Sequence, residues 1–124
     1  MEYLLLIYHD EAQGARASEA DKQAMYAAYG AYTQSIRESG NMIGGNALLP
    51  SSAGTTVRVR SGETLVTDGP YAETKEQLAG YYHVTAENID EAIELASRIP
   101  GARYGTIEVR PIMEVPAAVA EPAR

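Results

Sequence analysis

The chain has 124 residues, of which 45% are hydrophobic and 22% are charged, proportions that predict a single soluble globular domain. Its 10 basic and 17 acidic side chains give a net charge of −7, which removes any general electrostatic attraction to nucleic acid or to an anionic membrane. Because cysteine is absent, disulfides, zinc–thiolate sites, iron–sulfur clusters and a cysteine nucleophile are excluded. We expect a cytoplasmic protein, since the longest apolar run, Tyr3–Tyr8, is too short for a membrane span and lacks the flanks of a signal peptide.

The N-terminal third predicts a buried strand and one long helix. Residues 2–9 carry apolar side chains on both alternating faces, which favours a strand covered on both sides. Residues 10–17 are polar and predict a loop. Ser18 followed by Asp21 is typical of a helix start, and the helix should end near residue 38, before Gly40. Its apolar stripe consists of Met25, Tyr29, Tyr32 and Ile36.

The middle of the chain predicts one interrupted strand and a hairpin. Residues 42–49 read as a strand, in which Gly44 and Gly45 indicate a bulge or a close approach by another backbone or a ligand. Residues 55–60 alternate, and we expect Val57 and Val59 to point inward. A tight turn at residues 61–62 leads to a partner strand over residues 63–67.

The C-terminal part predicts a strand, a helix and a strand, after a break at residues 68–70 and an ordered loop or one helical turn over residues 71–79. Residues 80–86 form the first of these strands, and Asn88 caps the helix. The last strand spans residues 104–115, and residues 116–124 are expected to be a flexible tail. The helix should bury Ile89, Ala92, Ile93, Ala96 and Ile99.

This order of elements predicts an α+β fold in which one antiparallel sheet carries two helices on one face. The strands at residues 2–9 and 80–86 should lie at its centre, because both carry apolar or aromatic residues on both faces. Two helices cover only one face. We therefore expect a second copy of the chain to cover the other, which makes the protein a homodimer.

Several segments together resemble one protein family. The block Asp68-Gly69-Pro70-Tyr71-Ala72-Glu73-Thr74-Lys75-Glu76 is the most specific of them. The start at residues 3–8, the segments 44–48 and 80–82, and Glu108-Val109-Arg110-Pro111 also match. Over residues 1–115 the chain resembles the YCII-related, or DGPF-domain, family as a single domain, with Tyr71 in place of the phenylalanine of the family name.

The resemblance implies a ferredoxin-like fold assembled as a dimeric α+β barrel. It also implies similarity to small cofactor-free enzymes, among them a lactone dehydrochlorinase, for which a His–Asp pair has been proposed. We therefore expect the chain to bind or transform a small molecule without a cofactor, by acid–base chemistry of the lyase, isomerase or hydrolase kind. Two alternatives are a non-catalytic partner of an extracytoplasmic-function sigma factor, as the resemblance also implies, and a cofactor-free oxygenase.

The first candidate catalytic residue is Asp68, which follows a strand where a rigid sheet can aim a carboxylate into a cleft. With Glu73 and Lys75 it can supply an acid, a base and a cation for proton transfer. The structural alternatives are that Asp68 serves the Asp-Gly-Pro turn, and that Glu73, Lys75 and Glu76 form surface ion pairs.

His83 and His9 are further catalytic candidates, because histidine titrates near neutral pH. They would approach a common cleft if their strands are neighbours. The alternative is that each is a hydrogen-bonded structural residue. No metal site is expected, since His9, Asp10 and Glu11 cannot all face one ion from a straight strand.

Three more side chains are candidate ligand-binding groups. Tyr8 and Tyr82, beside Tyr81, can line an aromatic slot, although core packing also explains them. Arg110 can bind an anionic ligand or pair with Glu108 or Glu114. No phosphate-binding glycine loop is present, so no nucleotide site is expected.

Overall fold

The computed structural model describes residues 1–116. The strands are β1 (Glu2–His9), β2 (Met42–Ala47), β3 (Thr55–Arg60), β4 (Glu63–Asp68), β5 (Gln77–Thr85) and β6 (Thr106–Pro111). The helices are α1 (Glu11–Ala15), α2 (Glu19–Glu38) and α3 (Ile89–Ser97), with 3₁₀ turns at Ser51–Ala53 and Pro100–Arg103. Apart from Pro116, the predicted tail lies outside the described residues.

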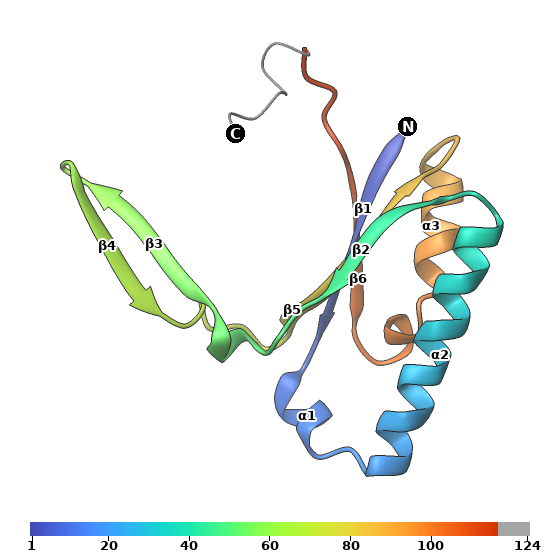
Figure 1. The fold of residues 1–124 in the computed structure, drawn as a ribbon, viewed down its shortest axis with the longest axis horizontal. Helices are drawn as coiled ribbons and strands as arrows, with labels where there is room; N and C mark the ends of the chain where they lie inside the picture. The colour runs from blue at the N-terminus through green and yellow to red at the C-terminus, as the bar shows by residue number, and fades with distance from the viewer. Residues whose placement is uncertain (117–124) are drawn as a thin grey trace.

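Four strands form an antiparallel sheet in the order β2-β5-β1-β6, and both long helices, α2 and α3, cover one of its faces (Figure 1). This is the predicted α+β fold of the ferredoxin-like type, and the two strands expected at the centre, β1 and β5, are the central ones. No helix within residues 1–116 has the length and apolar character needed to cross a membrane.

The core lies between this sheet and the two helices. Tyr3, Leu5 and Ile7 of β1 point into it, and the intervening residues of the same strand point to the other face. The buried residues are Tyr3, Leu5, Ile7, Tyr32, Ile36, Tyr82, Val84, Ala86, Ala92, Leu95, Ala96 and Ile99. The opposite face, which we call the open face, carries neither α2 nor α3 (Figure 1).

Local signals in the sequence set the ends of the helices. The Ser18 hydroxyl accepts a hydrogen bond from the Asp21 amide, and Asn88 Oδ1 accepts one from the Glu91 amide, so both predicted caps are confirmed. Residues 10–17 were expected to be a loop, and this was wrong in part. The Asp10 carboxylate caps the short helix α1 by accepting from the amides of Ala12 and Gln13.

The buried stripe of α3 differs from the prediction. Leu95 is buried, whereas Ile89 and Ile93 are exposed. Residues 92, 95, 96 and 99 follow one helical stripe at the spacing i, i+3, i+4, i+7, and residues 89 and 93 lie along its edge. The surface that α3 buries against the sheet is therefore narrower than the positions of its apolar residues in the sequence predicted.

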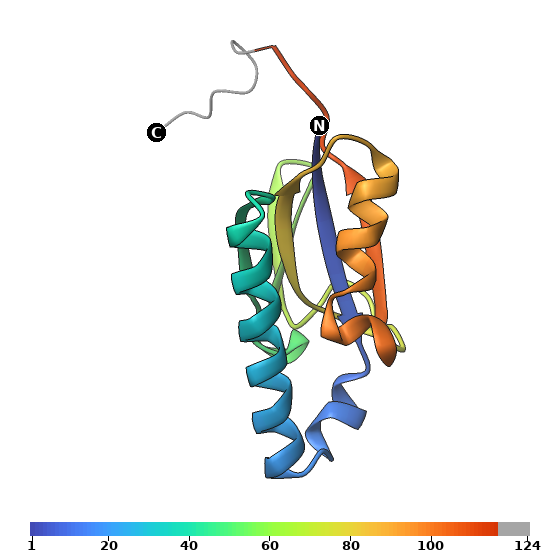
Figure 2. The same ribbon diagram turned by 90° about the vertical axis from the view of Figure 1, so that its right-hand side faces the viewer.

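The hairpin is the larger difference. β3 and β4 pair only with each other and form a separate two-stranded sheet that extends away from the main body, on the side opposite the helices (Figures 1 and 2). Val57 and Val59 are exposed, so the prediction that they point into the core was wrong. The alternation of apolar and polar residues over residues 55–60 correctly predicted a strand. It does not indicate what the apolar side of that strand contacts.

Candidate functional site

A cleft of about 620 Å³ lies where the hairpin joins the main sheet. Tyr8 lines it from the end of β1, and Leu78 lines it from the start of β5. The other walls come from residues 47–51, 53–56 and 69–72, together with Thr74, Glu76 and Gln77. The lining is mostly apolar with a few polar groups, a combination typical of sites for small molecules.

The Asp-Gly-Pro-Tyr block forms one side of this cleft. Residues 69–72, 74 and 76 line it, and residues 68, 73 and 75 do not. Gly69 makes this course possible, because its φ of +96° lies in the left-handed region that other residues rarely adopt. The Gly69 amide donates to Gly54 O at 2.7 Å, and Thr56 Oγ1 donates to Gly69 O at 2.8 Å, which fastens the block to β3.

A second set of hydrogen bonds fixes the opposite wall. The Glu11 carboxylate accepts from the Ser51 amide at 2.7 Å and from the Ser51 hydroxyl at 2.8 Å. The Glu11 amide donates to Gln77 Oε1 at 2.9 Å. Helix α1 therefore ties residue 51 to the start of β5, a role for Glu11 that sequence reasoning missed because no local pattern links the two segments.

Two polar side chains line the sheet end of the cleft, Tyr8 and Glu76. The Tyr8 hydroxyl donates to Glu108 Oε1 at 3.4 Å, and Glu76 Oε1 accepts from Thr106 Oγ1 at 2.8 Å. Tyr8 and Thr106 are register partners across β1 and β6. Burial, followed by the negative charge of Glu108, raises the pKa of Tyr8, which keeps the phenol protonated and a hydrogen-bond donor at neutral pH.

The predicted ligand residue Arg110 lies beside this pair. Its guanidinium forms an ion pair with Glu108, with Nε 2.9 Å from Oε2, which is one of the alternatives that the sequence left open. The hydrogen bond to Glu108 is the main cause of a raised pKa at Arg110. The guanidinium thereby neutralises the carboxylate that accepts the Tyr8 hydrogen bond.

Three of the four charged residues of the block lie outside the cleft. Asp68 is exposed at the end of β4, where its register partner is Thr55, and Glu73 and Lys75 are exposed in the following loop. By contrast, Glu76, which sequence reasoning favoured as a surface ion-pair residue, lines the cleft. The residues of the block that reach the cleft are thus mainly its apolar and hydroxyl-bearing members.

The two histidines do not meet, although their strands are neighbours. His83 pairs with Leu4 and His9 pairs with Gln77, which separates them by five residues along β1, roughly 17 Å. The odd separation also places them on opposite faces of the sheet. On the open face, His83 Nε2 lies 2.7 Å from Glu2 Oε1, so His83 has an acidic partner that sequence reasoning missed.

The remaining candidate, Tyr82, belongs to the core. Its ring packs edge-to-face on Tyr32 with centroids 5.1 Å apart, and its hydroxyl is 2.7 Å from Thr33 Oγ1. This supports the packing alternative for Tyr82. Its neighbour Tyr81 lies on the open face and accepts a hydrogen bond from Asn46 Nδ2.

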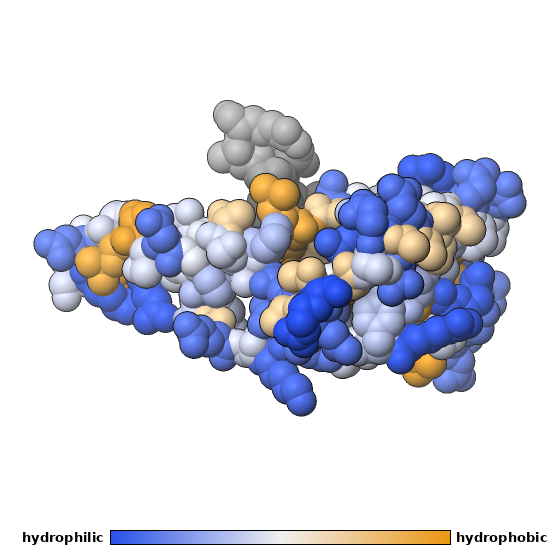
Figure 3. Space-filling model, turned by 90° about the horizontal axis from the view of Figure 1, so that it is seen from below, coloured by the Kyte–Doolittle hydropathy of each residue, from blue (hydrophilic) through white to orange (hydrophobic). Residues whose placement is uncertain are grey.

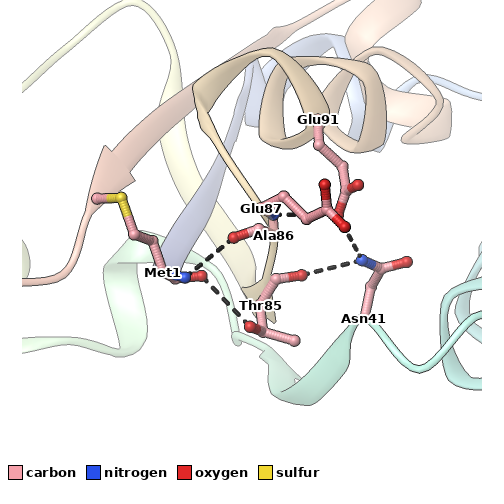
Figure 4. A pocket seen from close by; sticks show the side chains of 6 residues that line it. All are labelled: Met1, Asn41, Thr85, Ala86, Glu87 and Glu91. Carbon is pink, nitrogen blue, oxygen red and sulfur yellow. Dashed lines mark hydrogen bonds between the residues drawn. The ribbon is translucent and has the colours of Figure 1, made fainter.

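A smaller crevice of about 250 Å³ lies at the far end of the sheet (Figure 4). Asn41 Nδ2 donates to Thr85 O at 2.9 Å and to Glu91 Oε1 at 3.1 Å, and the Met1 amino group donates to Ala86 O at 3.0 Å. Because these groups satisfy one another, the crevice joins β1, β5 and α3 and offers little to a ligand. Residues 1–116 contain no cluster of three or more metal-ligating side chains of the His, Cys, Asp or Glu type.

Comparison with known proteins finds a family model and a similar protein that match this chain. The family model of the YCII-related domain matches residues 1–116. The chain is also 36% identical over 114 residues to an uncharacterized protein of Rhizobium meliloti (strain 1021), an alignment that covers 90% of this chain and 92% of that protein. The match to the family model spans the whole described region, from β1 to the end of the last strand and just beyond it. The chain therefore belongs to the YCII-related family.

Proposed function

We propose that the protein binds a small organic molecule in the cleft at the base of the hairpin and acts on it by acid–base chemistry without a cofactor. The observation that supports this most is the course of the Asp-Gly-Pro-Tyr block. A turn would need only its first three residues, yet the block continues along the wall of a 620 Å³ cleft as far as Glu76.

The chemistry follows from the two polar groups at the sheet end of the cleft. The protonated Tyr8 phenol has a single O–H, which can turn from Glu108 to donate a hydrogen bond to a carbonyl oxygen of the ligand. The Glu76 carboxylate, which lines the same cleft, can accept a proton from the adjacent carbon, which leaves an enolate whose oxygen faces Tyr8. Return of that proton to another atom gives an isomerisation, and loss of a leaving group gives an elimination. The ring of Tyr71, which also lines the cleft, suits a planar ligand.

The test is a ligand screen with small aromatic acids, lactones and keto acids, read out by thermal shift and by NMR of the protein. For any compound that binds, Tyr8→Phe and Glu76→Gln should each weaken binding by roughly three- to tenfold, the effect of one hydrogen bond. A turnover assay on the same compounds then separates binding from catalysis.

Matched controls come from the same chain. Glu73→Gln changes a carboxylate in the same block that does not line the cleft, and Tyr26→Phe changes an exposed tyrosine of α2. Both should leave binding unchanged. If Glu73→Gln weakens ligand binding as much as Glu76→Gln does, the proposal is contradicted.

We further propose that the protein is a homodimer that forms through the open face. Leu4, Leu6 and Tyr8 of β1 point to this face beside Tyr81 of β5. The chain has an accessible surface of 8889 Å², against roughly 6,450 Å² for a compact monomer of this mass. Even the full unfolded-chain surface of residues 117–124, roughly 1,100 Å², leaves an excess of roughly 1,300 Å², which is in the range that one partner buries in a stable dimer.

Analytical ultracentrifugation tests the dimer directly. The wild-type chain should sediment as a dimer at micromolar concentration. Leu6→Lys, which places a charge on the open face, should sediment as a monomer, because burial of the new ammonium group between two chains removes its hydration. A wild-type monomer throughout the micromolar range would refute the homodimer.

Other expectations remain predictions. They are the cytoplasmic location, the sigma-factor partner, the oxygenase alternative, and catalytic roles for Asp68, His83 and His9. Substitution of His83 by Gln, which removes the imidazole beside Glu2, is the direct test of the histidine at this face.

A further inference from the structure

One face of the β3–β4 hairpin is apolar and exposed. Val57 pairs with Val66 across the two strands, and Val59 lies beside them on the same face. These three side chains are 60%, 64% and 59% exposed, respectively. The other face carries Arg58, Arg60, Glu63, Leu65 and Thr67. The hairpin is therefore amphipathic, and the three valines of its apolar side are largely exposed.

The contacts within the hairpin are too few to explain why it is folded. An isolated two-stranded sheet is at best marginally stable in water, and an apolar face adds stability only when something covers it. Here β3 and β4 form a sheet of their own, and the hydrogen bonds at its base, from Gly69 to Gly54 and from Thr56 to Gly69, join the two ends of the hairpin to each other. A covering surface from outside residues 1–116 is thus needed.

The position of the hairpin suggests which surface this is. It extends from the end of the main sheet on the side of the open face, opposite α2 and α3 (Figure 1). Viewed from below, the apolar residues of the hairpin form a patch at the end of the molecule remote from the helices (Figure 3). A body that lies on the open face would therefore lie next to the hairpin as well.

We infer that the β3–β4 hairpin is a dimerisation arm whose valine face, Val57, Val59 and Val66, packs against the second copy of the chain. This inference rests on the homodimer proposed above. In a two-fold dimer each chain gives one arm and receives one, so both apolar faces are covered by the same contact.

Charge favours a second copy as the occupant. Two chains of net charge −7 repel each other, so their contact requires surfaces that add no further repulsion. The hairpin meets this requirement, because Arg58 and Arg60 balance Glu63 and Asp68 and its net charge is zero. The excess surface of the single chain is also large enough for the arm and the open face to be buried together.

The test compares two neighbouring positions of β4 that point to opposite faces. Val66→Lys should raise the dimer dissociation constant by at least roughly tenfold, as for a central interface residue, when measured by sedimentation equilibrium. Thr67→Lys introduces the same charge on the polar face and should change it by less than roughly twofold. Equal dissociation constants for Val66→Lys and the wild type would overturn the arm.

Leu6→Lys separates failure of the arm from failure of the dimer. If Leu6→Lys is monomeric and Val66→Lys dimerises like the wild type, the homodimer stands and the arm is refuted. If the wild type itself is monomeric, both are refuted.

A second measurement avoids a charged side chain in the hairpin. Because the chain has no cysteine, Val66→Cys and Thr67→Cys each introduce a unique thiol. Maleimide labelling of Val66→Cys should slow as the protein concentration rises through the dimer range, and labelling of Thr67→Cys should slow much less. Labelling of Val66→Cys at a rate independent of concentration would refute the arm.

Discussion

Two adjacent glycines of β2 have different structural roles. A Cβ atom added at Gly45 would lie 2.8 Å from Tyr81 O and 3.1 Å from Tyr82 Cδ1, whereas one added at Gly44 would meet nothing within 4 Å. The register between β2 and β5 shifts between Met42 and Gly44. The glycine pair was expected to mark a bulge or a close approach, and both are confirmed, the bulge before Gly44 and the close approach at Gly45.

Gly45→Ala should therefore destabilise the fold by about 1–3 kcal/mol, the usual cost of forcing an atom into a packed site. Gly44→Ala should stay within about 0.5 kcal/mol of the wild type. Urea unfolding followed by circular dichroism measures both. If both variants lose the same free energy of unfolding, the contact with Tyr81 O does not restrict the size of the side chain at residue 45.

The buried tyrosines predict how stability changes at alkaline pH. Burial raises the pKa of Tyr29 to about 12 and raises that of Tyr32 further, from an ordinary value of 10.0. The Tyr32 hydroxyl donates to Leu95 O at 2.7 Å and loses this bond when it ionises. Between pH 10 and 12 the unfolded chain releases these protons and the folded chain retains them, so the free energy of unfolding should fall as pH rises through this range.

Chemical unfolding at several pH values between 9 and 12 tests this, together with absorbance titration of the phenolates. Tyr29→Phe and Tyr32→Phe should each make the decline of stability with pH shallower, because neither phenylalanine ionises. Tyr26→Phe, at an exposed position, should leave the decline unchanged. If none of the three variants alters the decline of stability with pH, ionisation of Tyr29 and Tyr32 is not its cause.

At the scale of the element, α3 depends on the residue that caps its N-terminus, Asn88. The helix is only nine residues long, yet it supplies Ala92, Leu95 and Ala96 to the core. Asn88 Oδ1 accepts from the Glu91 amide at 3.0 Å and so satisfies a backbone donor that would otherwise lack a partner.

Asn88→Ala should lower the free energy of unfolding by about 1 kcal/mol, and Asn88→Ser, which keeps a capping oxygen, should recover most of it. Thermal unfolding by circular dichroism provides the measurement. Equal stability of the alanine and serine variants would show that the cap contributes nothing to α3.

At the scale of the whole molecule, the proposed homodimer makes thermal stability depend on concentration. Association with a second copy stabilises the folded chain by mass action, so Tm should rise as the protein is concentrated. Scanning calorimetry over a hundredfold range of concentration measures the shift. Leu6→Lys, as a monomer, should have a Tm that is independent of concentration, and a wild-type Tm that is equally independent would argue against the dimer.

The sequence by itself determined the elements and most of their faces. Short segments with apolar or aromatic residues on both faces identified β1 and β5, and the caps Ser18 and Asn88 located the starts of α2 and α3. Because β1 and β5 are apolar on both faces, their central position in the sheet could also be predicted. These features depend on neighbours in the chain, whose spacing is fixed by covalent geometry and by backbone hydrogen bonding.

Tertiary structure alone decided where the cleft lies and which side chains enter it. Nothing local distinguishes Glu76, which lines the cleft, from Glu73, which does not, because the difference arises from how the loop meets β1 and β6. The register of β1 with β5 separates the two histidines. The hairpin extends outward because β3 and β4 pair only with each other, and no strand of the main sheet within residues 1–116 pairs with either. Each depends on contacts between residues far apart in the chain, and such contacts are set by the packing of the whole fold rather than by any pattern in the sequence.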